Sequence, residues 1–169
     1  FKPFEYTDAD GNFVGIDVEL LAAIAEDQGF TYDLQYIGWD AAIAACQAGQ
    51  ADGMIAGASI TDERKANGWT FSNGYYDSQL VVAVAIDNEA ITGIDDLTAD
   101  MKVAAQTGTT GAAKVQELYD QGKIKEAVIL DGLDTCMMQL INGQFSPNDP
   151  ERFRELYNAL LIDGGYNRP

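Results

Sequence analysis

The order of apolar and polar residues along the chain predicts alternating strands and helices. Residues 30–36 alternate strictly between apolar and polar side chains, which is typical of a strand with one buried face. Residues 79–86 form a valine-rich apolar run, as expected of a further strand. Strands are also expected at 52–56, 101–106 and 127–130, and helices after Asp17 and Asp40, at 61–64, and over 112–119, 133–141 and 151–161. This order favours an α/β architecture with largely parallel sheets.

Residues 8–19, DADGNFVGIDVE, place oxygen-bearing side chains at the first, third, fifth and twelfth positions, as a calcium-binding EF-hand loop does. An EF-hand also needs glycine at the sixth position and an apolar residue at the eighth, where this segment has Phe13 and Gly15. No helix is expected before it, and Asp10-Gly11 is a hairpin signal. The pattern therefore predicts a turn between two short strands rather than a calcium site.

Composition excludes several classes of function. The formal charge is −17, from 27 acidic and 10 basic residues, so a nucleic acid would be repelled over most of the surface. The chain has no histidine, which excludes most zinc sites and the usual Ser-His-Asp and Cys-His nucleophiles. Cys46 and Cys136 lie in apolar helical patterns and are interpreted as small buried residues, with a disulfide or a reactive thiol as the alternative. We expect no metal and no cofactor. No apolar run reaches membrane-spanning length.

Two glycine-bearing loops, 56–61 (AGASIT) and 106–111 (QTGTTG), lie where a predicted strand ends and a helix begins. In open α/β sheets ligands bind at such places, because backbone N–H groups point into the crevice. Hydroxyls of Ser59, Thr109 and Thr110 could add hydrogen bonds to an anion. Neither loop matches a nucleotide-binding signature. Ordinary turns remain an equal explanation for both loops.

Arg64 strengthens the prediction of an anion site at the first of these loops. It follows Ser59 by five residues in a chain where basic residues are scarce, and a guanidinium can hold a carboxylate with two hydrogen bonds. The alternative is a surface ion pair, for example with Asp62. Phe1 and Trp39 could enclose the apolar stem of a ligand, or could belong to the core.

Four motifs, in order over residues 1 to about 143, resemble the extracellular solute-binding proteins of family 3, the polar amino-acid receptors of bacterial ABC importers. They are FKPF (1–4), GIDVEL (15–20), GMIAGASITDER (53–64) and FSNGYY (71–76). The resemblance implies a periplasmic-binding-protein-like fold of type II, in which two α/β lobes joined by a hinge close on an amino acid. It implies lobe one at 1–85, a partial lobe two at 86–144, a C-terminal helix at 145–169 that returns to lobe one, and a hinge near 83–85.

The resemblance also implies roles for individual residues. Arg64 would hold the ligand α-carboxylate, helped by Ser59 and by Thr110 of lobe two. Phe1 and Trp39 would stack on the ligand side chain. The backbone of Ala56 and Gly57 would face the ligand, and Gln106 and Thr109 would line the pocket from lobe two.

The sequence departs from the family pattern in two places. The strand that precedes Phe1 in the family is missing, and Gln144–Phe145 resembles a seam at which several dozen residues have been lost. The lost part would include the aspartate that binds the ligand ammonium. We therefore expect a fragment or truncated form that binds an amino acid weakly, or as an oligomer that completes the lobe-two sheet.

The predicted function is that of a non-catalytic binding component of an amino-acid ABC transporter, working with a membrane permease outside the cytoplasm, in the periplasm or lipid-anchored on the outer face of the membrane. The alternatives are an enzyme like cyclohexadienyl dehydratase and an extracellular sensor domain on the same scaffold. The sequence does not choose among glutamine, arginine, lysine and cystine as the ligand.

Overall fold

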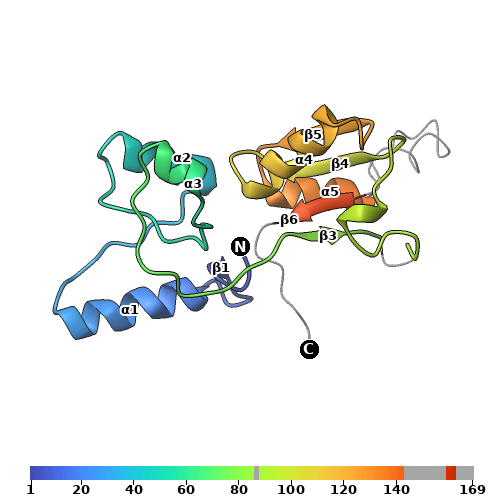
Figure 1. Ribbon diagram of the computed structural model, residues 1–169. Coiled ribbons are helices and arrows are strands. Elements are labelled where there is room, and N and C mark those ends of the chain that lie inside the picture. Colours follow the sequence, from blue (N-terminus) through green and yellow to red (C-terminus); the bar gives the residue numbers. More distant parts are fainter. Residues whose placement is uncertain (86–87, 143–158, 163–169) are drawn as a thin grey trace. The chain divides into compact units, whose positions relative to one another are not determined.

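The computed structural model describes residues 1–85, 88–142 and 159–162 and divides the chain into two compact units, unit 1 (Phe1–Tyr76) and unit 2 (Asp77–Pro169). Figure 1 labels most elements of both units. The division falls between Tyr76 and Asp77, whereas the prediction extended the first lobe to residue 85. Each unit is described by itself.

Unit 1 begins with a small antiparallel hairpin of β1 (Tyr6–Thr7) and β2 (Phe13–Val14). The Asp8 side chain holds its turn, because Oδ1 accepts hydrogen bonds from the backbone N–H groups of Asp10 (2.9 Å) and Asn12 (2.8 Å). The hydrogen bonds from Asn12 lower the pKa of Asp8. The predicted turn between two strands is confirmed. Within the described ranges, no group of three or more Asp, Glu or Cys side chains is placed to hold a metal ion.

Helix α1 (Ile16–Gln28) follows the hairpin and ends at Gly29, whose φ of 70° lies in the left-handed region. The prediction that Asp17 caps this helix is wrong. Gly15 is the N-cap residue, and Asp17 lies inside the first turn with no exposed surface. Gly15 has a φ of 133°, and a Cβ there would lie 2.2 Å from the Phe4 carbonyl oxygen, so only glycine fits.

Two further helices complete unit 1: α2 (Trp39–Gln47) and α3 (Asp62–Ala66). The N-cap residue of α2 is Gly38, so the predicted Asp40 cap is also wrong. Thr61 is the N-cap residue of α3, and the helical turn predicted at 61–64 is confirmed. Cys46 of α2 is partly exposed rather than buried.

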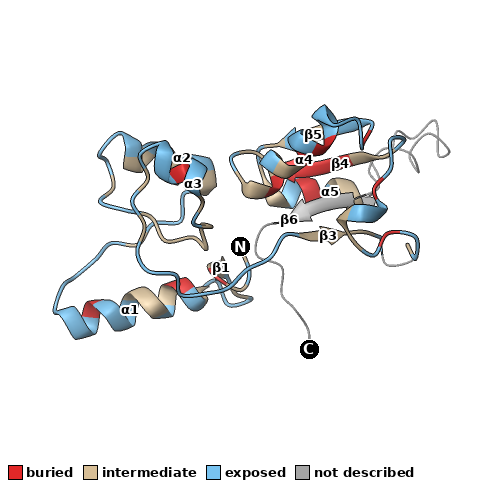
Figure 2. Ribbon diagram, in the orientation of Figure 1, coloured by how far each residue is buried: buried red, intermediate tan, exposed pale blue. Residues whose placement is uncertain are grey.

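The strands predicted at 30–36 and 52–56 are absent from the structure. All of unit 1 is described, and β1–β2 is its only ladder, so neither segment has a neighbouring strand to pair with. Without that pairing, Phe30 and Tyr32 are each 44% exposed and Tyr36 is 64% exposed. The buried apolar side chains of unit 1 are Phe4 and Ala25, and exposed positions prevail along its ribbon in Figure 2.

Unit 2 is built on a four-stranded sheet with the order β3-β6-β4-β5. Strand β4 pairs in parallel with β5 and β6, whereas β3 pairs antiparallel with β6. This confirms the expected α/β arrangement for this unit. The elements are β3 (Val81–Ala83), the 3₁₀ helix η1 (Ile94–Asp96), β4 (Lys102–Gln106), α4 (Thr110–Asp120), β5 (Glu126–Leu130), α5 (Leu133–Asn142) and β6 (Ala159–Ile162).

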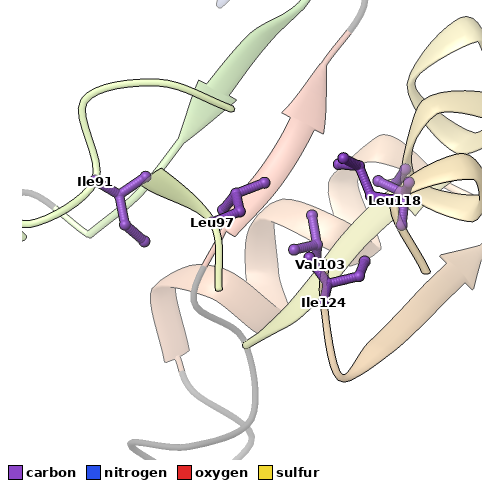
Figure 3. Packing of buried hydrophobic residues seen from close by; sticks show 7 residues of the cluster. Ile91, Leu97, Val103, Leu118 and Ile124 are labelled. Carbon is purple, nitrogen blue, oxygen red and sulfur yellow. The ribbon is translucent and has the colours of Figure 1, made fainter. Parts of the chain in front are cut away.

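Alternate side chains of β4 pack against different helices, because successive residues of a strand point to opposite faces. Val103 and Ala105 join the α4 residues Val115 and Leu118 in one apolar cluster, and Ala104 packs with Cys136 of α5. Ile91, Leu97 and Ile124 extend the first cluster, as Figure 3 shows. Cys136 is buried as predicted, and burial raises the pKa of its thiol.

The C-terminal part differs from the prediction. Residues 159–161, expected at the end of a helix belonging to lobe one, lie in strand β6 in the sheet of unit 2. A strand here gains ladder hydrogen bonds on both sides, from β3 and β4, which a helix would not make. The rest of the predicted helix and the seam at 144–145 lie outside the described residues. None of the described helices is long and apolar enough to cross a membrane.

Candidate functional site

Arg64 lies in the five-residue helix α3, and its backbone takes part in the hydrogen bonds at both ends of this helix. At the N-terminus, the hydroxyl of Thr61 accepts a hydrogen bond from the Arg64 backbone N–H at 3.1 Å. At the C-terminus, Gly68 (φ 90°) donates to the Lys65 carbonyl at 3.0 Å, and Trp69 donates to the Arg64 carbonyl at 3.0 Å. These two bonds form a Schellman motif, which reverses the chain after Gly68. Local sequence therefore fixes the backbone of Arg64 from both sides.

The Arg64 side chain is buried, with 9% of its surface exposed. Its Nη1 donates a 2.7 Å hydrogen bond to the Ser59 carbonyl, and its Cζ lies over the rings of Trp39 (5.3 Å to the centroid) and Trp69 (5.2 Å). Both distances are within the range of cation–π attraction. The structure thus brings Trp39, Ser59 and Arg64 together, and the alternative of a surface position for Arg64 is excluded.

Gly57 lies in the loop that precedes α3 and is fixed by two contacts within unit 1. Its φ is 56°, and a Cβ would lie 2.9 Å from Cγ of Phe4, so the loop packs directly on the Phe4 ring. Its N–H donates to Asp17 Oδ2 at 2.8 Å. The N–H of Gly57 is therefore used in a hydrogen bond within unit 1. The backbone groups that could still face a ligand, as predicted, are the Gly57 carbonyl and the backbone of the partly buried Ala56.

Asp17 connects this loop to a second segment. Its Oδ1 accepts a 2.8 Å hydrogen bond from the Tyr75 hydroxyl, while Oδ2 accepts from Gly57. Burial and the neighbouring Asp17 carboxylate raise the pKa of Tyr75. Asp17 is thus a buried acceptor that joins α1, the Gly57 loop and the 71–76 segment.

Phe1 stacks on Phe4, with ring centroids 5.4 Å apart, and is partly exposed. Its ammonium group pairs with the Glu5 carboxylate, with 3.5 Å between the nitrogen and Oε1. The other oxygen of Glu5, Oε2, is buried without a hydrogen-bond partner among the described residues. Burial raises the pKa of Glu5 to about 7, with the Asp17 charge adding to the rise and the ammonium opposing it.

The predicted residues of unit 2 lie together where β4 ends and α4 begins. The Thr109 hydroxyl caps α4 by accepting from the Ala112 N–H (3.1 Å), and it donates to the Gln106 carbonyl (2.7 Å). The Gln106 side chain reaches the Asp131 carbonyl at 3.5 Å, and Thr110 is the first residue of α4. The N-terminus of an 11-residue helix next to two hydroxyl groups favours negative charge.

Sequence reasoning missed Asp17 as a buried acceptor and Trp69 as a neighbour of Arg64. For Asp17 the sequence carries no local signal, because its partners Gly57 and Tyr75 lie 40 and 58 residues away. For Trp69 a signal existed: Gly68 directly after a short helix predicts a Schellman motif, and that motif brings the next residue back over the last turn.

Unit 1 thus holds a buried guanidinium beside the loop that precedes α3, and unit 2 has a largely parallel sheet with a helix N-terminus flanked by hydroxyl groups. Comparison with known proteins identifies the family. The chain matches the family model for bacterial extracellular solute-binding proteins, family 3, over residues 1–163, and it belongs to this family.

Among curated relatives, a probable histidine-binding protein of Neisseria gonorrhoeae is 36% identical over 143 residues, covering 85% of this chain and 52% of the relative. The arginine-binding extracellular protein ArtP of Bacillus subtilis (strain 168) is 31% identical over 162 residues, covering 88% of this chain and 62% of the relative. The chain therefore spans only part of the length of these relatives.

Among solved structures, an ancestral arginine-binding protein bound to arginine aligns with a TM-score of 0.81 at 28% identity, covering 96% of this chain and 66% of the other. The arginine-, lysine-, histidine-binding protein ArtJ of Geobacillus stearothermophilus aligns with a TM-score of 0.78 at 29% identity, covering 97% and 63%. The fold class is that of the type II periplasmic-binding proteins, as the sequence predicted.

Proposed function

We propose that this chain is the ligand-binding part of a receptor that captures a free polar amino acid for an ABC importer. Arg64 would bind the α-carboxylate of the ligand, and no catalytic step is assigned. The setting would be extracytoplasmic, in the periplasm or lipid-anchored on the outer face of the membrane, with a membrane permease as the partner. Family membership and the binding functions named for the relatives support this assignment.

The observation that carries the proposal is the burial of Arg64 in unit 1. Lys2, Arg64 and Lys65 are the only basic residues among residues 1–76, and Arg64 is the one that is buried. Burying a cation costs several kcal/mol unless other groups compensate it. Here the Ser59 carbonyl and two indole rings lie against the guanidinium, so a positive charge is held at a fixed place in a largely aromatic setting. A carboxylate is a ligand group that an arginine binds strongly, often with two parallel hydrogen bonds.

L-arginine is the first ligand to test. Several relatives carry arginine in their names, although others are named for histidine or cystine. The net charge of −17 would also raise the rate at which a cationic amino acid approaches. We propose that the rings of Phe1 and Trp39 stack on the side chain of such a ligand. The backbone of Ala56 and Gly57 would also face the ligand.

Gln106, Thr109 and Thr110 of unit 2 are proposed as further ligand-binding residues, as the family resemblance implies. The N-terminus of α4 and the neighbouring hydroxyl groups support this assignment. We further propose that binding by this chain alone is weak, or needs an oligomer, because the family resemblance assigns the ammonium-binding aspartate to a segment that this sequence lacks.

A thermal-shift screen of the chain against the twenty amino acids, followed by calorimetric titration, tests the proposal. We expect stabilisation by at least one polar amino acid and none by its amide or its decarboxylated analogue, because both lack the carboxylate. Failure of all twenty amino acids to stabilise the chain would contradict the proposal. Turnover of prephenate would favour the alternative of a dehydratase, and the ancestral amino-acid-binding protein AncCDT-1, a precursor of cyclohexadienyl dehydratase, aligns with a TM-score of 0.77 at 28% identity.

A further inference from the structure

Both tryptophans of the chain lie against the same guanidinium. The sequence contains two, Trp39 and Trp69, and the Cζ atom of Arg64 lies over the rings of both. Trp39 begins α2 and was predicted to stack on a ligand, whereas Trp69 follows α3 and had no predicted role. Trp69 therefore needs a separate explanation.

The backbone explains how Trp69 reaches Arg64. In a Schellman motif the residue after the left-handed glycine donates to a carbonyl in the last turn, and the side chains of these two residues are usually in hydrophobic contact. In α3 the pair is Trp69 and Arg64, joined by a 3.0 Å backbone hydrogen bond. Here a cation–π contact replaces the usual hydrophobic contact, with Cζ of Arg64 5.2 Å from the centroid of the Trp69 ring. Gly68, with a φ of 90°, is the residue on which this reversal depends.

The contact with the Trp69 ring limits the motion of the Arg64 side chain. A cation–π contact is made with the face of the ring and contributes about 0.5–2 kcal/mol, depending on burial. The planar set of guanidinium N–H groups is the part of an arginine that recognises an anion. A long side chain that is already fixed loses less rotamer entropy when it binds a ligand.

We propose that Trp69 is a positioning residue for carboxylate binding, because the Gly68 turn holds its ring against the guanidinium of Arg64. This inference rests on the proposed function of Arg64. It adds a residue that acts through Arg64 and touches no ligand itself.

The first experiment needs no ligand. The side-chain Nε–Hε resonance of Arg64 is followed by ¹⁵N NMR in the unsubstituted chain and in Trp69→Leu and Trp69→Phe variants, with Arg64→Lys for assignment. We expect the ring currents of Trp69 to displace this resonance, so that Trp69→Leu moves it toward the value of an exposed arginine and Trp69→Phe restores part of the displacement. A resonance that is the same in the unsubstituted chain and in Trp69→Leu would overturn the proposal.

The second experiment measures binding of L-arginine. Trp69→Leu should weaken binding about five- to tenfold, while Trp69→Phe keeps most of the affinity. Gly68→Ala should also weaken binding, because alanine disfavours the left-handed turn. Gly49→Ala is its matched control: Gly49 (φ 68°) closes α2 with the same two hydrogen bonds, and neither glycine has an atom within 4 Å of the place that a Cβ would take. We expect Gly49→Ala to lower stability equally and to leave the affinity unchanged.

The proposed function and the positioning role can fail separately. If the unsubstituted chain binds none of the amino acids, the proposed function is wrong, while the NMR comparison still decides whether Trp69 positions Arg64. If the unsubstituted chain binds L-arginine and Trp69→Leu binds it equally well, the positioning role is wrong and the proposed function stands.

Discussion

At the scale of single residues, hydrogen bonding distinguishes two acidic residues of unit 1. Glu5 and Asp17 are both acids of an acidic chain, yet they are in opposite situations. Asp17 is fully buried and accepts two hydrogen bonds, whereas Glu5 has one buried oxygen without a partner among the described residues. A carboxylate that lacks hydrogen bonds in a buried position is held more easily in its neutral form.

This difference predicts a pH-dependent stability that originates at Glu5. Its pKa rises from 4.5 to about 7 on folding, so the stabilisation of its neutral form is complete below pH 4.5 and is lost as the pH rises through 7. The chain has no histidine, so few other groups titrate in this range. We expect the free energy of unfolding of Glu5→Gln to exceed that of the unsubstituted chain by about 1–2 kcal/mol at pH 8, and by less at pH 5. Urea unfolding at the two pH values measures this difference.

Tryptophan fluorescence is the suitable signal for this measurement, because Trp39 and Trp69 both lie in unit 1. Glu19→Gln is the control, since Glu19 is an exposed acid in the first turn of α1. A Glu5→Gln variant whose advantage over the unsubstituted chain is the same at pH 5 and pH 8 would show that Glu5 does not titrate as described.

At the scale of elements, unit 1 depends on links between segments that no strand ladder joins. Asp17 supplies such a link, between α1, the Gly57 loop and Tyr75. We expect Asp17→Asn to lower the free energy of unfolding of unit 1 by about 1–3 kcal/mol, because the amide N–H₂ cannot accept the bond that the carboxylate accepts. Urea unfolding followed by tryptophan fluorescence measures this change. If Asp17→Asn unfolds at the same urea concentration as Glu19→Gln, the link contributes nothing.

The elements also show which parts of the fold the sequence could predict. In unit 2 local signals were sufficient: the strand predicted at 101–106 and the helix predicted over 112–119 correspond to β4 and α4. In unit 1 the alternation at 30–36 predicted a strand, but a strand forms only with a partner, and none is present in this unit. The β6 strand at 159–162 was missed for the opposite reason, because neighbours distant in sequence determine its conformation.

The contacts of the candidate site also differ in how far the sequence could predict them. Thr61, Ser59 and Arg64 lie within six residues, so their proximity followed from the sequence, but the cap at Thr61 and the burial of Arg64 came only from the structure. Asp17 could not be predicted as an acceptor, because its partners are set by the tertiary structure. The contact of Trp39 with Arg64 was likewise not predicted, since α2 and α3 are separate helices.

At the scale of the whole molecule, the proposed function depends on a carboxylate meeting Arg64. The remaining roles, including the ring contacts and the cap at Thr109, matter for function only if that contact exists. Family membership supports amino-acid binding in general, while the relatives named for arginine, histidine and cystine show how widely the side chain of the ligand can vary. The α-carboxylate is the group that all these ligands share.

The most direct test follows the Arg64 Nε–Hε resonance while L-arginine, and separately agmatine, its decarboxylated analogue, is added to the chain. We predict that L-arginine moves the resonance to a saturating new position and that agmatine leaves it unchanged. A saturating displacement by agmatine equal to that by L-arginine, or an Arg64 resonance that stays fixed while L-arginine binds elsewhere, would contradict carboxylate binding by Arg64.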